Sequence, residues 1–294
     1  LLYPLIDRAI GNGVIESLFT KLMKLSDDGF NKFHALLEKT DIEDVVSFAG
    51  KVANKLEFLE FLHELIYGDI SKILKERSQL HKIVEKELWL FGEAYNGTPV
   101  LWSDKKIGNI LEELRSKYFN YNPTVEDDNL IEFEGVEGLD NITDLFFFNN
   151  KILDDGKKEI MVVELKAPTC AISRKELQQI DDYAFTVESY AGLPTENVKY
   201  KFILISSKLT AYAQSKLRAA RNKYDKPFLY DCKTGKDIEV YVMEWSEIIE
   251  VNKRKLGYLS SSLQIKDKSV KEKFETEYSD IIDEKISARL TKTK

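Results

Sequence analysis

Apolar side chains recur every three or four residues through the first 70 residues, which is the spacing of helices with one buried face. The stretches 14–25, 30–40 and 45–70 each follow this pattern. In the last stretch, one apolar stripe is formed by Val52, Leu56, Leu59 and Ile66. Such a stripe normally packs into a core, so the sequence predicts a helical region over residues 1–70.

The helical spacing continues beyond residue 70. It predicts a helix or helix pair over 71–95 and a further helix over 103–118, with the basic residues of the latter pointing outward. The acidic, turn-rich stretch 120–141 predicts a loop.

From residue 142 the chain changes to short apolar runs that are typical of strands. The runs 142–150 and 159–166 flank the sequence DDGKK and predict a hairpin. Further strands are predicted at 199–207, 227–231 and 238–245, and helices at 173–189, near 209–223 and after residue 245. Strands and helices in this order predict an α/β fold with a mixed central sheet flanked by helices.

These changes of pattern divide the chain into three predicted parts. Residues 1–70 form a helical region, 71–260 an α/β domain, and 261–294 a highly charged extension that we expect to pack loosely. The chain begins with LLYPL and has Leu at its first position, so we expect it to be cut from a longer protein. The helical region would then pack on the missing upstream part or on a second copy of the chain.

Composition excludes some classes of protein. The net charge of −7 argues against a protein that coats nucleic acid, although an acidic body can carry a local basic groove. Cys170 and Cys232 suit a reducing cytoplasm, and the three histidines lack the spacing of a zinc site. No apolar run reaches the roughly 18 residues of a membrane-spanning helix. We therefore expect a cytoplasmic protein that does not span a membrane.

Charged side chains interrupt two of the predicted strands. Glu164 and Lys166 are two residues apart and so share one strand face, while Leu165 takes the other. Burying such charges is costly unless they serve a site. Together with Asp144 on the preceding strand, Glu164 supplies the carboxylate pair that Mg²⁺ favours, and Lys166 can orient water and stabilise charge beside it. A buried Glu–Lys ion pair, or a strand end open to solvent, would account for the same residues.

These residues resemble the motif of the PD-(D/E)XK nuclease superfamily. Asp144 followed by Glu164, Leu165 and Lys166 matches it, although Thr143 stands where the family has Pro. The order of elements from about residue 71 to 256 is also similar to that of a restriction-endonuclease-like core, and the resemblance covers roughly residues 71–260. The resemblance implies metal-dependent cleavage of phosphodiester bonds, with Asp144 and Glu164 as metal ligands.

The helix after the second strand carries another element of this kind. Gln179 and Tyr183 resemble the Q-x-x-x-Y element of RecB-like members. They are four residues apart and lie on one helix face, from which they could reach substrate phosphate or hold Lys166. A polar helix surface is the simpler alternative.

Superfamily members often carry a further acidic ligand on the first core helix. Glu76 is our preferred match for it, with Glu87 and Glu93 as alternatives. A solvated helix glutamate would explain any one of the three.

Several sequence segments of the chain together look most like the Shedu-like nuclease domains of bacterial defence proteins. They are LWLFGEAY, ITDLFFF, VVELKAP and ELQQIDDYA. Some relatives carry that domain behind a GHKL (Hsp90-like) ATPase domain, which this resemblance implies as a possible upstream neighbour.

Exposed basic residues offer a surface for DNA. They are expected on the two helices after the Glu164 strand, at Arg174, Lys175, Lys216, Arg218, Arg221 and Lys223. Contacts of this kind position a duplex without reading its sequence. A solvated helix face is the alternative.

The candidate site predicts an Mg²⁺-dependent DNA endonuclease, with Mn²⁺ able to substitute. The resemblance implies a role in bacterial defence against phage or plasmids. The alternative is a nuclease-fold module that binds nucleic acid or a partner protein without cleaving. A third hypothesis makes residues 1–70 a region of homo-oligomerisation. The form of the substrate, whether duplex, nicked, single-stranded DNA or RNA, stays open.

Overall fold

The computed structural model describes residues 23–92, 95, 100–119, 137–149, 156–260, 274, 276–283 and 285–286. The chain divides into two compact units, Leu1–Lys55 and Leu56–Lys294. The predicted limits 1–70, 71–260 and 261–294 differ from this division and stay a prediction about domains.

Two helices make up most of the described residues up to 70, as predicted, and residues 1–22 lie outside the described part. Helix α3 spans Asp27–Leu37 and α4 spans Ile42–Tyr67. The start of α3 is fixed by Ser26, whose Oγ accepts a hydrogen bond from Gly29 N at 3.2 Å and so satisfies one free donor of the first turn. Within the described residues, no helix is long and apolar enough to cross a membrane.

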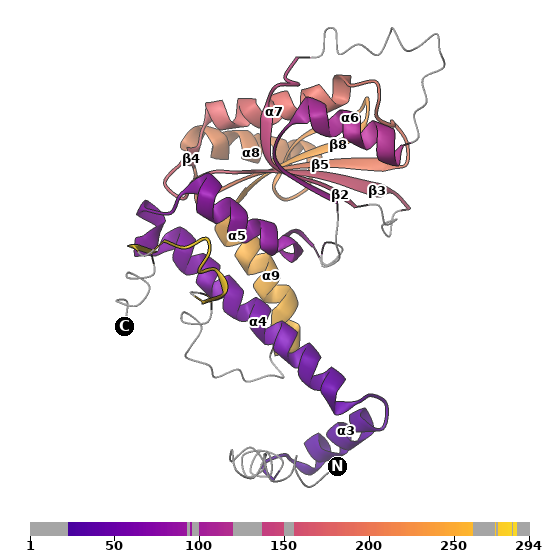
Figure 1. Cartoon of the computed structure of the whole chain (residues 1–294), viewed down its shortest axis with the longest axis vertical. Coiled ribbons are helices and arrows are strands. Elements are labelled where there is room, and N and C mark those ends of the chain that lie inside the picture. The colour runs from indigo at the N-terminus through magenta and orange to yellow at the C-terminus, as the bar shows by residue number, and fades with distance from the viewer. Residues whose placement is uncertain are drawn as a thin grey trace. The chain divides into compact units, whose positions relative to one another are not determined.

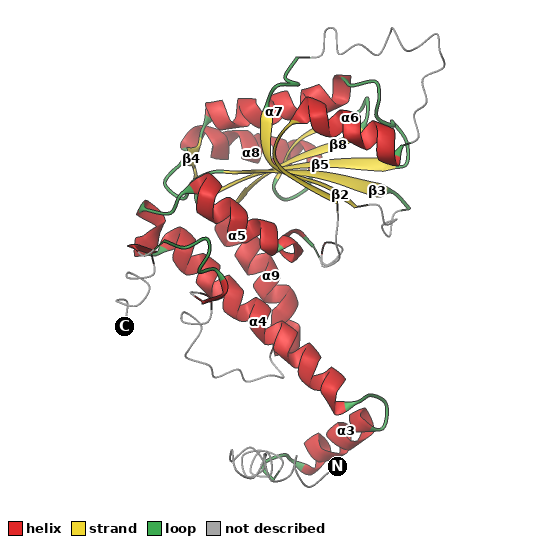
Figure 2. Cartoon of the chain, viewed as in Figure 1, coloured by secondary structure: helices red, strands yellow, loops and turns green. Residues whose placement is uncertain are grey.

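A six-stranded sheet in the order β1-β2-β3-β5-β8-β7 forms the centre of the second unit. Its strands are β1 Val100–Lys106, β2 Ile142–Asn149, β3 Lys158–Leu165, β5 Val198–Ser206, β7 Leu229–Lys233 and β8 Asp237–Glu244. Strands β3, β5 and β8 are parallel to one another, whereas β1, β2 and β7 pair antiparallel to their neighbours. The predicted α/β fold with a mixed central sheet is confirmed (Figure 2).

Helices cover both faces of this sheet (Figure 1). The helices α6 Ile107–Tyr118, α7 Arg174–Ser189 and α8 Ala211–Tyr224 lie on one side, and α5 His81–Lys86 and α9 Trp245–Ser260 lie on the other. Phe146, Ile160 and Val162 belong to the apolar core shared with the first group. Because side chains two apart on a strand share a face, Glu164 also faces α7, where Gln179 contacts it.

The segment 103–118, predicted as one helix, starts in a strand and becomes helical only from Ile107. Residues 100–106 form β1, which pairs with β2 from Val100 opposite Phe148 to Lys106 opposite Ile142, and α6 begins only at Ile107. The prediction of a helix from residue 103 was therefore wrong over its first four residues. The cause is that Ser103, Asp104 and the two following lysines are polar, so they carry no alternation that would mark an edge strand.

The predicted helix over 71–95 is broken into short pieces. A 3-10 turn, η1 Asp69–Lys72, is followed by a π-helical segment, η2 Glu76–Leu80, which runs into α5. A second 3-10 turn, η3 Leu88–Phe91, follows. Single π-helical turns are rare and are often found at functional sites.

The described part of the C-terminal extension is well packed, which contradicts the expectation of loose packing. Phe274, Tyr278, Ile282 and Ile286 are buried at intervals of four residues, although the segment is highly charged overall. The ring of Phe274 stacks on that of Phe61 with centroids 5.0 Å apart. Aromatic packing on one face therefore holds this segment.

Truncation of one of these rings tests the docking. Phe274→Ala should lower the free energy of unfolding by about 3 kcal/mol, because it leaves a cavity beside Phe61. Urea unfolding followed by circular dichroism measures this loss. Phe185→Ala, in which the removed ring is 52% exposed, is the control and should change the free energy by less than about 0.5 kcal/mol. Equal losses in the two variants would contradict a docked C-terminal segment.

Candidate active site and metal centre

The two acids predicted as metal ligands face each other across neighbouring strands. In the pairing of β2 with β3, Leu145 lies opposite Val163, so one step further along this register Asp144 lies opposite Glu164. Opposite residues of antiparallel strands have Cβ atoms about 5 Å apart. Asp144 and Glu164 are only 2% and 3% exposed. The fold thus places two carboxylates side by side with little access to water.

Burial makes this carboxylate pair costly. It raises the pKa of Asp144 to about 6, although a hydrogen bond from Leu165 N to Asp144 Oδ2 at 2.8 Å works against it. Burial, followed by repulsion from Asp144, raises the pKa of Glu164 to about 7. Glu164 Oε2 is buried and has no hydrogen-bond partner in the described part of the chain. Oxygen donors in this state fit a hard divalent cation such as Mg²⁺.

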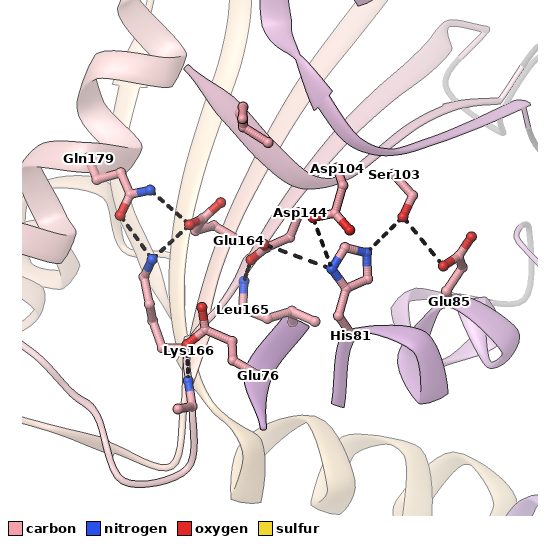
Figure 3. A network of polar contacts seen from close by, with 12 residues as sticks. Glu76, His81, Glu85, Ser103, Asp104, Asp144, Glu164, Leu165, Lys166 and Gln179 are labelled. Atoms are coloured by element: carbon pink, nitrogen blue, oxygen red, sulfur yellow. Dashed lines mark hydrogen bonds and ion pairs between the residues drawn. The ribbon is translucent and has the colours of Figure 1, made fainter. Parts of the chain in front are cut away.

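Lys166 lies beside this pair (Figure 3). Its Nζ donates to Glu164 Oε1 at 2.7 Å and to Gln179 Oε1 at 2.9 Å. Burial lowers the pKa of Lys166, but the neighbouring Glu164 carboxylate and its hydrogen bond outweigh this and the net shift is upward. Lys166 N donates to Ile205 O at 2.9 Å, which continues the pairing of β3 with β5. A charged ammonium is therefore held at a fixed place next to the two acids.

Helix α7 supplies both residues of the predicted Q-x-x-x-Y element. Gln179 Nε2 donates to Glu164 Oε1 at 2.8 Å and to Tyr183 OH at 2.7 Å. Tyr183 OH in turn donates to the main-chain oxygen of Ile142 at 2.8 Å. Gln179 thus links Lys166 and Glu164, whereas buried Tyr183 orients Gln179 against β2.

The chain between β3 and α7 is anchored before the helix begins. Ser206 Oγ of β5 donates to the carbonyl of Cys170. Ser173 and Glu176 then form a capping box, in which Glu176 Oε2 accepts from Ser173 N at 2.8 Å. Such a cap fixes the first turn of a helix, and with it the direction in which Gln179 points.

The structure also brings Glu76 to the site. Glu76 is the first residue of the π-helical segment η2, and its carboxylate accepts a hydrogen bond from Ala167 N, directly after Lys166. Its negative charge contributes to the raised pKa of Asp144. Glu76 is therefore within electrostatic range of the carboxylate pair.

The other two candidate glutamates are placed differently. Glu87 accepts hydrogen bonds from Trp89 Nε1 and Tyr278 OH, both at 2.5 Å, and so serves to hold packed rings. Glu93 lies outside the described residues. Between Glu76 and Glu87, the contacts favour Glu76 as the acid of the site.

Two residues that the sequence did not mark lie at the same place, His81 of α5 and Asp104 of β1 (Figure 3). His81 Nδ1 is 3.8 Å from Asp104 Oδ1 and 3.9 Å from Asp144 Oδ1. The potential ligand atoms of these three residues lie within 4.8 Å of one another. Burial lowers the pKa of His81, against the opposing effect of Asp104 and Glu85. Asp144 is thus shared by two sets of possible metal ligands.

The local pattern of the chain carries little sign of these residues. A single histidine between Leu80 and Ile83 has the pattern of a core position. Asp104 was missed as a candidate because the sequence predicted a helix from residue 103, which would not place it beside Asp144. Only the pairing of β1 with β2, in which the neighbours of Asp104 face those of Asp144, reveals it.

The basic residues predicted to contact DNA are exposed on α7 and α8. Arg174 and Lys175 form the first turn of α7. Lys216, Arg218, Arg221 and Lys223 lie along α8, which has no acidic residue. Beside them is a groove of about 330 Å³ lined by residues of α8 and β7, among them Lys216, Lys223 and Tyr230.

Comparison with known proteins identifies no family for this chain. No family model matches it, and no curated protein matches it. Among solved structures, the chain is similar to the crystal structure of a repair endonuclease from Pyrococcus abyssi, with 17% sequence identity and a TM-score of 0.28. The match covers 58% of this chain and 48% of that chain, and at this TM-score it carries no argument about function.

The raised pKa of Asp144 predicts an unusual dependence of stability on pH. A carboxyl group whose pKa is higher in the folded than in the unfolded protein stabilises the fold below its unfolded pKa, here about 4, and this stability is lost as the pH rises through its folded pKa. Asp144→Asn removes the ionising group. In EDTA at pH 8 the variant should therefore be more stable than the parent by on the order of 1–3 kcal/mol.

Urea unfolding at pH 4, 6 and 8 measures the difference. The advantage of Asp144→Asn should shrink toward pH 4, where the parent carboxyl is protonated in the folded state and about half protonated in the unfolded state. Asp140→Asn, at a side chain that is 92% exposed, is the control and should give no comparable gain at pH 8. A variant that is less stable than the parent at pH 8 would show that Asp144 is not a costly buried charge.

Proposed function

We propose that this chain is a metal-dependent endonuclease that hydrolyses phosphodiester bonds in DNA. The observation that carries the proposal is the buried carboxylate pair Asp144 and Glu164 with Lys166 held beside it. A fold rarely retains such a cluster, whose burial is costly, without a chemical use for it.

Asp144 and Glu164 would hold the metal ion, with Glu76 as a possible further ligand. The all-oxygen donor set favours Mg²⁺, with Mn²⁺ as a substitute. When bound, such an ion polarises the phosphodiester and lowers the pKa of water. The buried Glu164 Oε2, which has no hydrogen-bond partner among the described residues, supports this assignment.

The remaining residues would position charge around the reacting phosphate. Lys166 Nζ, fixed by Glu164 and Gln179, offers a preorganised cation for the charge that develops on the phosphate oxygens, and a donor that orients water. Gln179 acts through Lys166 and Glu164. Tyr183 acts through Gln179, since its own hydroxyl is occupied by Ile142 O.

The basic residues of α7 and α8 would bind the DNA backbone. Arg218 and Arg221 are exposed on a helix without acids, so phosphate meets no repulsion from α8 itself. Contacts to phosphate give affinity without sequence preference.

We place this activity in bacterial defence against phage or plasmids, in the cytoplasm. The support for this role is the resemblance of four sequence segments, LWLFGEAY, ITDLFFF, VVELKAP and ELQQIDDYA, to Shedu-like nucleases. Self-association through residues 1–70, which would bring two active sites to one duplex, belongs to the same proposal.

Loss of the lysine provides the direct test. Lys166→Ala should reduce cleavage of a plasmid in Mg²⁺ by about 100-fold or more, because it removes a preorganised charge from the reacting centre. Gel assays on supercoiled, linear and single-stranded DNA measure the rate. Lys255→Ala, at an exposed lysine of α9, is the control and should cleave as the parent does.

Binding measurements separate the proposal from its alternative. Lys166→Ala should still bind DNA, and its far-ultraviolet circular dichroism should match that of the parent. If the parent binds neither Mg²⁺ nor Mn²⁺ by calorimetry and cleaves none of these substrates, the chain is a nuclease-fold module that binds without cutting.

A charge reversal on α8 tests the DNA surface. Arg218→Glu with Arg221→Glu should weaken binding to a labelled duplex, and the salt slope of log K should fall by about 1 for each arginine that no longer binds a phosphate. Fluorescence anisotropy at several salt concentrations measures both. Arg254→Glu with Lys255→Glu makes the same change of charge on α9 and should leave the slope unchanged. Equal effects of the two pairs would assign the weaker binding to net charge alone.

A further inference from the structure

One ring nitrogen of His81 makes no hydrogen bond within the described part of the chain. The side chain is 1% exposed, and Nδ1 has no hydrogen-bond partner among the residues that the structure describes. It points at Asp104 and Asp144, but at 3.8 and 3.9 Å it is too far from their oxygens for a hydrogen bond. A buried polar atom aimed at two carboxylates across such gaps requires an explanation.

The other nitrogen of the ring belongs to a short chain of hydrogen bonds. His81 Nε2 lies 2.9 Å from Ser103 Oγ, and Ser103 Oγ donates to Glu85 Oε2 at 3.4 Å. A hydroxyl has one proton to donate. When Ser103 gives that proton to Glu85, its oxygen is left to accept from Nε2–H, so this chain of contacts favours a proton on Nε2.

This direction of donation favours the Nε2–H tautomer of His81. A neutral ring with its proton on Nε2 has a free lone pair on Nδ1. That lone pair then faces the lone pairs of two carboxylate oxygens, an arrangement that is repulsive until a cation lies among them. Two ligands each about 2.1 Å from one ion lie roughly 3–4 Å apart, which agrees with the two separations around Nδ1.

The backbone of β1 makes the arrangement possible. Neighbouring residues of a regular strand face opposite sides, so Ser103 and Asp104 would not both reach one ring. Asp104 has a φ of 52°, in the left-handed region that is costly for residues other than glycine, although Asp is among the few that adopt it. This local strain lets Ser103 and Asp104 approach the two nitrogens of the same imidazole.

We propose that Ser103 and Glu85 are positioning residues that hold His81 as its Nε2–H tautomer, so that Nδ1 completes a nitrogen-containing cation site with Asp104 and Asp144. Imidazole favours transition-metal ions over Mg²⁺, which takes oxygen ligands. The site therefore biases the centre toward an ion such as Co²⁺ or Zn²⁺. The inference rests on the proposed function in one respect, namely that Asp144 is a metal ligand.

Metal affinity and the tautomer test this without any measurement of cleavage. In calorimetry of the full chain, Ser103→Ala should weaken Co²⁺ binding about 10-fold or more and leave Mg²⁺ binding within about twofold of the parent. Ser103→Thr keeps the hydroxyl and should restore the Co²⁺ affinity. Ser116→Ala removes the hydroxyl of an exposed serine on α6 and is the control.

Nitrogen-15 NMR of histidine-labelled, metal-free protein reports the tautomer directly. The chain has three histidines, and His34 and His63 are exposed, so His81 is identified by its burial. The parent should show the Nε2–H form, and Glu85→Ala should weaken this preference in protein that still folds.

Two results would overturn the inference. One is a parent protein with its proton on Nδ1, and the other is equal Co²⁺ affinity in Ser103→Ala and Ser116→Ala. The parent protein could fail to cleave DNA while Ser103→Ala still binds Co²⁺ more weakly than Ser116→Ala. That result would count against the nuclease proposal alone.

Discussion

The antiparallel pairing of β2 with β3 is the constraint on which the rest of the site depends. Its register sets Asp144 opposite Glu164. Both carboxylates are buried, and burial raises the pKa of each. The apolar strands around them must therefore supply enough stability to hold two groups that resist burial.

The surrounding residues compensate only part of the free-energy cost of burying the two carboxylates. Lys166 offsets the charge of Glu164, and Gln179 joins the two into one hydrogen-bonded unit. Since Glu164 Oε2 is left without a hydrogen bond within the described residues, the compensation is incomplete. A bound cation would complete this compensation. The cluster is therefore better explained as a binding site for a cation than as a source of stability for the fold.

Asp144 also lies between two halves of the centre and belongs to both. Toward β3 it meets oxygen donors and a lysine, and toward β1 and α5 it meets the imidazole of His81 and the carboxylate of Asp104. The first half suits a hard ion and the second a softer one. A single carboxylate shared between such different donor sets links the two halves of the centre.

The sequence by itself determined the parts of this protein that depend on local periodicity. Alternation within a strand put Glu164 and Lys166 on one face, and helical spacing put Gln179 four residues from Tyr183, so the predicted sheet and these side-chain faces agree with the structure. Only the tertiary structure decided what depends on contacts between distant segments. The contact of Glu76 with Ala167 N, the strand β1 and the position of His81 and Asp104 beside Asp144 all follow from pairing and packing. A histidine in an apolar helix and an aspartate among lysines have no local pattern that fixes their partners, because register and helix docking are set by the whole core.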